Sequence, residues 1–232
     1  MTWNLKLFRF DEYFRSSYNI HMSHLPEISL RFIVLEGIDG CGKSTQVQLL
    51  GEWLREAGYT VTLTREPGGT ALAERLRALI LDQTITCSPR AELLMLLAAR
   101  AQHVAEVITP ALDAGGVVIC DRFTLSSLAY QGAGRGLPED EILAANATAT
   151  GGVMPDLTIV LDVPLKITMG RIGERQDRFE GEGAKFLTRV LAAYDAATGS
   201  TVMHISGSGT VTEVQAAIRR EILSRLNGEG VQ

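Results

Sequence analysis

The residues from Gly37 to Ser44 have the types and the spacing of a loop that binds phosphate. They fit the pattern G-x-x-x-x-G-K-[ST] at every required position. The glycines let backbone N–H groups turn toward phosphate oxygens, and the helix that follows adds a positive field. Lys43 can reach terminal phosphates, and the Ser44 hydroxyl can hold Mg²⁺. The predicted nucleotide-binding residues are Gly37, Ile38, Asp39, Gly40, Cys41, Gly42, Lys43, Ser44 and Thr45.

The segments on either side of this loop favour the same interpretation. Residues 31–36 form an apolar run typical of a buried strand, and residues 44–55 have the pattern of a helix. A chance glycine turn between a strand and a helix is the alternative. The full match in this setting argues against it.

Two further candidate functional residues, Asp121 and Arg122, directly follow the apolar run 117–120. An Asp at the end of a buried strand can order Mg²⁺ or its waters, and an Arg can bind a phosphate through its fork of donors. A surface ion pair is the alternative. We predict Asp121 as a metal-binding residue and Arg122 as a catalytic, phosphate-binding residue.

Polar side chains are concentrated between residues 124 and 136. Ser127, Tyr130 and Gln131 offer a hydroxyl, an aromatic ring and an amide, which suit a nucleobase or sugar pocket. The same residues also suit a helix start followed by a loop. Arg100 lies in a run of Leu and Ala, so a polar partner must meet it if that face is buried, and it is a candidate for a ligand contact.

Three late arginines, Arg171, Arg175 and Arg178, are spaced i, i+4 and i+7. In a helix they would share one face, where like charges repel unless an anion neutralises them. A polyphosphate is a natural partner, and the nearby glycines would permit a moving lid. A solvated arginine face relieved by neighbouring acidic residues remains equally open.

Strand-like and helix-like segments alternate after the phosphate loop, which predicts an α/β fold with a parallel sheet and helices on both faces. Ligands bind such sheets beyond the carboxyl ends of the strands. The later strands are expected at 60–63, 117–120, 157–161 and 202–205. The later helices are expected at 72–81, 90–113, 139–147, 184–196 and 212–226.

Composition limits the partners. The chain has 232 residues, of which 46% are hydrophobic, and a formal net charge of −5. This charge argues against nucleic acid as the main partner. No run of about 18 apolar residues occurs, so no membrane partner is expected. The three cysteines form no close pair and no metal spacing, which suits a reducing compartment, and a cytoplasmic location is expected.

The amino-terminal 29 residues differ from the rest. They mix aromatic residues with charges of both signs and lack the apolar core of a secretory signal. We expect residues 1–29 to be a poorly ordered extension, with Met22 as a possible native start, and residues 30–228 to form one domain that carries the phosphate loop. The extension is assigned no chemistry.

From about residue 31 onward, the chain resembles the bacterial thymidylate kinases. The stretches FIVLEGIDG, REPGGT, AARAQH, DR and AYQGAGRGL look like successive motifs of that family, in the same order. The resemblance covers nearly the whole chain apart from the extension. It implies a P-loop NTPase fold with a five-stranded parallel sheet and a short lid. It also implies a homodimer, and transfer of the ATP γ-phosphoryl group to dTMP with Mg²⁺, giving dTDP and ADP in dTTP synthesis.

The resemblance also implies roles for single residues. The catalytic arginine of the family lies in the lid, so Arg171, Arg175 and Arg178 are predicted catalytic residues alongside Lys43 and Arg122. Asp39 would meet the sugar 3′-hydroxyl, Arg100 the thymine, and Arg122 the monophosphate. Tyr130 would help to exclude a ribose 2′-hydroxyl, and Ser127 would face the base edge. The predicted substrate-binding residues are Asp39, Arg65, Leu96, Arg100, Arg122, Ser127, Tyr130 and Gln131.

Two positions depart from the family pattern. Leu96 stands where a phenylalanine usually stacks on thymine, which keeps a kinase for another nucleotide open as an alternative. Gln176 follows Arg175 where a glycine is common, so the sequence does not identify which lid arginine reaches the transition state. An NTP-driven switch is a third hypothesis. The absence of an Asn-Lys-x-Asp motif argues against its guanine-reading form.

Overall fold

The computed structural model describes residues 30–172 and 183–226. Five parallel strands form one sheet in the order β2-β3-β1-β4-β5. The strands are β1 (Phe32–Glu36), β2 (Val61–Arg65), β3 (Val117–Asp121), β4 (Leu157–Asp162) and β5 (Val202–Ser206). The expected α/β fold with a five-stranded parallel sheet is confirmed. The four later strands each end one or two residues later than predicted, and β2 also begins one residue later.

The central strand β1 sets the position of the chemistry. All five of its residues are buried, because neighbouring strands flank it and helices cover both faces. Leu35 pairs in register with Asp121 of β3 and with Ile159 of β4. The carboxyl ends of β1 and β3 therefore lie side by side, and the segments that follow them meet at one edge of the sheet.

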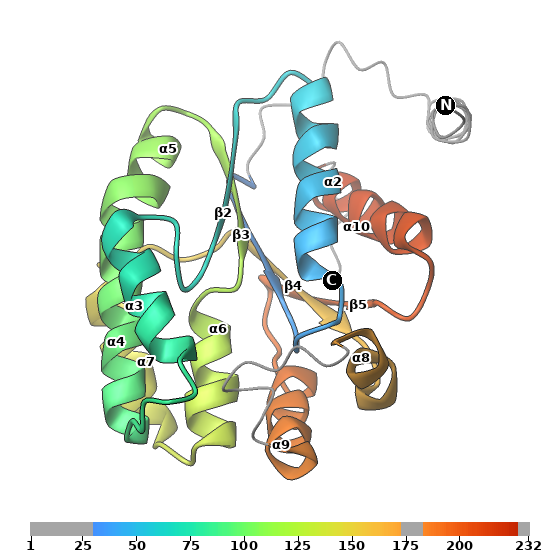
Figure 1. Ribbon diagram of the computed structural model, residues 1–232. Coiled ribbons are helices and arrows are strands. Elements are labelled where there is room, and N and C mark those ends of the chain that lie inside the picture. Colours follow the sequence, from blue (N-terminus) through green and yellow to red (C-terminus); the bar gives the residue numbers. More distant parts are fainter. Residues whose placement is uncertain (1–29, 173–182, 227–232) are drawn as a thin grey trace.

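The helices form a layer on each face of the sheet (Figure 1). On one face, α2 and α10 pack on Ile33, Leu35 and Ile159. On the other face, η1 packs against Phe32 and Val34. The helical segments are α2 (Lys43–Glu56), α3 (Ala71–Leu81), α4 (Pro89–His103), η1 (Val104–Ile108), α5 (Thr109–Asp113), α6 (Thr124–Ser127), η2 (Leu128–Gly134), α7 (Glu139–Thr150), α8 (Leu165–Ile172), α9 (Ala184–Asp195) and α10 (Val211–Leu226).

The helix predicted over 90–113 is helical throughout but is not one regular helix. A π-helical stretch, η1, separates α4 from α5. Pro110, at the start of α5, lacks the N–H that would bond to the carbonyl four residues earlier, so the preceding turn widens. The short helical segments α6, η2 and α8 were not among the predicted helices.

No helix in the described ranges is both long and apolar enough to cross a membrane. The predicted extension, residues 1–29, lies outside these ranges.

Candidate active site at the carboxyl edge of the sheet

The phosphate loop connects β1 to α2 and depends on glycine backbone geometry. Gly37, Gly40 and Gly42 have φ angles of 135°, 77° and 103°, which side-chain-bearing residues rarely adopt. A Cβ atom on Gly37 would lie 2.9 Å from the Leu161 carbonyl oxygen. The chain therefore turns sharply at the end of β1, and α2 begins at Lys43 with its amino-terminal N–H groups toward the loop.

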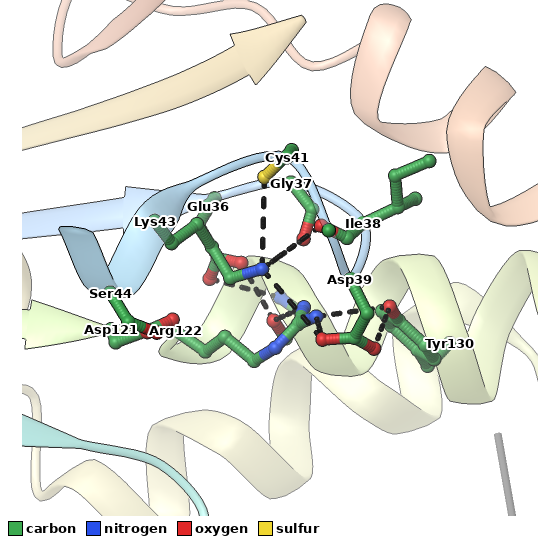
Figure 2. Close-up of polar contacts among 12 residues, drawn as sticks. Glu36, Gly37, Ile38, Asp39, Cys41, Lys43, Ser44, Asp121, Arg122 and Tyr130 are labelled. Atoms are coloured by element: carbon green, nitrogen blue, oxygen red, sulfur yellow. Dashed lines mark hydrogen bonds and ion pairs between the residues drawn. The ribbon is translucent and has the colours of Figure 1, made fainter. Parts of the chain in front are cut away.

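The Lys43 ammonium is held inside this loop (Figure 2). Its Nζ donates hydrogen bonds of 3.0 Å to the carbonyl oxygens of Gly37 and Ile38. The same atom lies 3.9 Å from the Asp39 carboxylate. The Lys43 side chain is only 6% exposed, so its charge is concentrated at the loop. Phosphate oxygens are stronger acceptors for an ammonium than these carbonyls.

Ser44 and Asp121 meet across the ends of α2 and β3. The Ser44 hydroxyl donates a 2.7 Å hydrogen bond to Asp121 Oδ2. A hydroxyl and a carboxylate are oxygen donors of the kind that Mg²⁺ prefers, and Mg²⁺ keeps several waters or phosphate oxygens as its other ligands. The pair fits that ion. The described residues hold no group of three or more His, Cys, Asp or Glu that would form a protein-only metal cage.

Arg122 follows β3 and joins the phosphate loop to the neighbouring helices. It is the only described non-glycine residue with a positive φ, 73°, and its N–H donates to the Leu35 carbonyl at 2.9 Å. Its Nη2 donates to Asp39 at 2.7 Å and to the Tyr130 hydroxyl at 3.1 Å. Its Nη1 donates to Ser126 at 3.2 Å and to Tyr194 at 3.0 Å. Figure 2 shows this guanidinium between the loop and Tyr130.

The charges in this cluster are set by their neighbours. Burial alone would raise the pKa of Asp39, but the charges of Arg122 and Lys43 outweigh it and lower this pKa. Burial raises the pKa of Tyr130 above its ordinary value. Asp39 is therefore a carboxylate at neutral pH, and the neutral Tyr130 hydroxyl donates to it at 3.2 Å.

Glu36, the last residue of β1, fixes the segment that carries Arg122. Its carboxylate accepts hydrogen bonds from the Phe123 and Ser126 N–H groups at 2.8 and 3.1 Å. It also accepts from the hydroxyls of Ser126 and Tyr194 at 2.6 and 3.0 Å. Glu36 is completely buried, and burial raises its pKa. This residue was not predicted, because a Glu at the end of an apolar run gives no sign of its partners.

A hollow of about 80 Å³ opens beside Arg122. Seven of the eight predicted substrate-binding residues line it, namely Asp39, Leu96, Arg100, Arg122, Ser127, Tyr130 and Gln131. Ser126, from the polar stretch 124–136, lines it as well, and the four lining residues not predicted are Glu66, Pro67, Arg77 and Leu81. The loop after β2 was identified only as the family motif REPGGT, which did not indicate that Glu66 and Pro67 would line the hollow.

Arg100 projects from α4 to the wall of this hollow and is 3% exposed. Its Nε donates to Glu66 at 2.7 Å, and its Nη1 donates to Ser127 at 2.9 Å and to Asn146. Its Nη2 donates to the Phe123 carbonyl at 3.0 Å. These bonds use four of its five N–H donors and leave one on Nη2 without a partner among the described residues.

Some predicted site residues do not line the hollow. Arg65 does not line the hollow: its half-exposed guanidinium pairs with Glu74 at 2.9 and 3.0 Å. Thr45 is exposed in α2. Arg171 of α8 reaches the phosphate loop, where its Nη1 donates to the Gly40 carbonyl at 3.2 Å. The other two predicted lid residues, Arg175 and Arg178, lie outside the described residues.

Three features define the class of this protein: a phosphate loop after the central strand, Asp121 and Arg122 at the end of β3, and a hollow beside them. It is a P-loop protein of the α/β class that can hold a nucleoside triphosphate next to a second small molecule.

Comparison with known proteins identifies the family within this class. A family model described as thymidylate kinase matches residues 35–218. A thymidylate kinase of Desulfovibrio desulfuricans is 51% identical over 175 residues, which cover 71% of this chain and 81% of that protein. A thymidylate kinase of Pelobacter propionicus is 43% identical over 209 residues, which cover 84% and 95%. The crystal structure of thymidylate kinase from Ehrlichia chaffeensis is similar with a TM-score of 0.68 at 34% identity, covering 82% of this chain and 97% of that one. The chain belongs to the thymidylate kinase family of phosphotransferases.

Proposed function

We propose that this chain transfers the γ-phosphoryl group of ATP to the 5′-phosphate of dTMP, giving dTDP and ADP, through the residues gathered at the carboxyl edge of its sheet. Family membership supports the reaction. The observation that carries the assignment of residues is the position of Arg122. Its guanidinium binds Asp39 of the phosphate loop at 2.7 Å and also lines the hollow, so one cation borders both binding regions.

The donor side is the phosphate loop. Residues 37–45 hold the ATP phosphates through backbone N–H groups and the start of α2. Lys43 exchanges the carbonyls of Gly37 and Ile38 for the terminal phosphate oxygens. Arg171, already at the Gly40 carbonyl, adds charge as the transferred group moves. Arg175 and Arg178 are proposed as further lid cations.

Ser44 and Asp121 are proposed as the residues that hold Mg²⁺. When bound, the ion neutralises charge on the phosphate oxygens of the donor. The Ser44 hydroxyl and the Asp121 carboxylate are 2.7 Å apart, so both can serve one cation.

The acceptor side is the hollow. Arg122 binds the monophosphate with its fork of donors, in exchange for hydrogen bonds that its Nη1 and Nη2 groups make within the protein. Asp39 accepts from the sugar 3′-hydroxyl. Arg100, Ser127 and Gln131 meet the base edge, while Leu96 covers the base face. Tyr130, whose hydroxyl is fixed between Arg122 and Asp39, stands where a ribose 2′-hydroxyl would need room. Holding the acceptor and the donor end to end supplies most of the catalysis in phosphoryl transfer.

The proposal extends to assembly and location. Large apolar side chains are exposed on α3, α4 and α7, which form one outer layer in Figure 1; these are Leu72, Leu79, Leu94 and Leu143. Such an apolar surface supports a homodimer that covers this layer. A cytoplasmic enzyme is proposed, in keeping with cysteines that form no disulfide among the described residues.

The proposed function is tested with a panel of acceptors. Purified protein, ATP and Mg²⁺ are mixed with dTMP, dUMP, UMP or dCMP, and the diphosphate formed is measured. We expect the highest kcat/KM for dTMP. A preference for another monophosphate would favour the second candidate, a kinase for a different nucleotide, which the aliphatic Leu96 in the hollow keeps open. ATP hydrolysis without transfer to any acceptor would contradict both.

A further inference from the structure

A buried polar group behind the base end of the hollow takes no direct part in the proposed reaction. Glu92 of α4 is 0% exposed, so its carboxylate depends on protein partners. Arg135 supplies two of these, with Nε at 3.2 Å from Oε1 and Nη2 at 3.0 Å from Oε2. Gln131 supplies another, with Nε2 at 2.9 Å from Oε1.

This arrangement fixes the orientation of the Gln131 amide. A side-chain amide can be turned over with little change in shape, so its hydrogen-bond partners decide which end faces which way. The Glu92 carboxylate only accepts hydrogen bonds, and the Arg135 guanidinium only donates them. Gln131 must therefore present its NH₂ group to Glu92. Its carbonyl oxygen, Oε1, has no partner among the described residues, and Gln131 lines the hollow.

The base end of the hollow then offers one acceptor and one donor. The acceptor is Gln131 Oε1, and the donor is the Nη2 hydrogen of Arg100 that the described residues leave unpaired. Thymine and uracil present an N3–H donor beside the O4 acceptor, which complements this pair. Cytosine presents an N3 acceptor beside an N4 amino donor, which places like groups against each other.

We infer that Glu92, held by Arg135, is a positioning residue that selects the acceptor base by fixing the polarity of the Gln131 amide. The inference rests on the proposed function, because it concerns the base of the acceptor. It adds to that function a determinant of specificity that contacts no substrate atom.

The test compares kcat/KM for dTMP with kcat/KM for dCMP, measured with ATP and Mg²⁺ on one preparation of each variant. The ratio of the two values does not depend on the fraction of active protein. In Glu92→Gln, the new amide oxygen accepts from Arg135 and its NH₂ faces Gln131, which turns the Gln131 amide over. We expect the ratio to fall by roughly 10- to 100-fold, since a donor and an acceptor in a buried site become mismatched.

Two matched variants separate this role from a structural one. Arg135→Lys keeps a cation that only donates to Glu92, so the amide stays as it is and the ratio stays within about threefold of the unmodified protein. Glu141→Gln removes a carboxylate from the exposed pair with Arg90 of α4, without a contact to Gln131, and leaves the ratio unchanged. If Glu92→Gln does not fold, Glu92→Leu combined with Arg135→Met removes both charges together. Nothing then fixes the Gln131 amide, which can turn over to suit either base, and the ratio still falls.

The outcomes are distinct. An unchanged ratio in Glu92→Gln, or an equal fall in Arg135→Lys, would overturn the inference while leaving the proposed function intact. Should the unmodified protein show no preference for dTMP over dCMP, the proposed function itself would fail.

Discussion

At the scale of single residues, the charge of the site is set by the Asp39 carboxylate and by the two cations beside it, Lys43 and Arg122. Arg122 and Lys43 lower the pKa of Asp39, although burial alone would raise it. A lowered folded pKa means that the stabilising ion pairs are complete above the unfolded value of about 4 and are lost as the pH falls through the folded value. The cluster is therefore charged throughout the neutral range, where phosphoryl transfer needs it.

Lys43→Met tests the role of Lys43 on the donor side of the site, where the ATP phosphates are proposed to bind. We expect kcat to fall by about 100-fold or more, because a preorganised charge at the terminal phosphates is removed. Circular dichroism should show an unchanged fold, since every partner of the Lys43 ammonium belongs to the phosphate loop: the carbonyls of Gly37 and Ile38, the Cys41 sulfur and the Asp39 carboxylate. Lys185→Met, an exposed lysine of α9, serves as the control with normal kcat. Normal turnover in Lys43→Met would remove this lysine from the mechanism.

Local patterns identified the residues that bind ligands better than the residues that support them. The phosphate-loop pattern, Asp121-Arg122 and the family motifs pointed to side chains that meet at one edge of the sheet. Glu36 and Tyr194 were missed because their roles come from contacts between strand β1 and helix α9, which are 158 positions apart. No spacing in the sequence encodes such a contact.

At the scale of elements, the close approach of η2 to α9 depends on Gly134. A Cβ atom there would lie 2.6 Å from a ring carbon of Phe186, and that ring also contacts Tyr130 with ring centroids 6.2 Å apart. Gly134→Ala should therefore lower the free energy of unfolding by roughly 1–3 kcal/mol. Denaturant titration measures this, with Gly170→Ala as the control because its Cβ would meet nothing within 4 Å. Equal stability of the two variants would show that the interface tolerates the added atom.

A second prediction concerns the pairing of β4 with β5. His204 Nε2 lies 2.8 Å from the Ala197 carbonyl and Nδ1 lies 3.0 Å from Asp162, so both ring nitrogens face acceptors. Burial alone would lower the pKa of His204, but these hydrogen bonds and the Asp162 charge outweigh it and raise this pKa. The stabilisation is complete below about pH 6.5 and is lost as the pH rises through the raised folded value.

His204→Gln should therefore lower Tm at pH 5.5 by only about 1–3 °C, because the pair is partly exposed. At pH 9 its Tm should match that of the unmodified protein. Thermal denaturation at the two pH values measures this. An equal loss at both values would mean that the charge on His204 is not the cause.

The order of elements was predictable because alternating apolar patterns identify strands and helices one by one. The π-helical stretches η1 and η2 could not be predicted from such patterns, because each depends on local competition between backbone hydrogen bonds. Pro110 explains the first of these. The short helix α6 depends on Glu36, whose carboxylate accepts from the Phe123 and Ser126 N–H groups.

At the scale of the whole molecule, the exposed leucines of α3, α4 and α7 predict self-association. Leu94 is 65% exposed on α4. Leu94→Glu should shift a dimer toward monomer in sedimentation equilibrium, because a charge would be buried at the proposed interface. Val211→Glu, at an exposed position of α10, should leave the assembly unchanged. A protein that is monomeric before any substitution would contradict the proposed homodimer.

The central claim is that Arg122 belongs to the acceptor side of a cleft whose donor side is the phosphate loop. The most direct measurement is the KM for dTMP and the KM for ATP in Arg122→Lys, which keeps the charge and loses the fork of donors. We predict that the KM for dTMP rises by about tenfold or more, while the KM for ATP stays near that of the unmodified protein. An unchanged KM for dTMP, or an equal rise in the KM for ATP, would contradict the account.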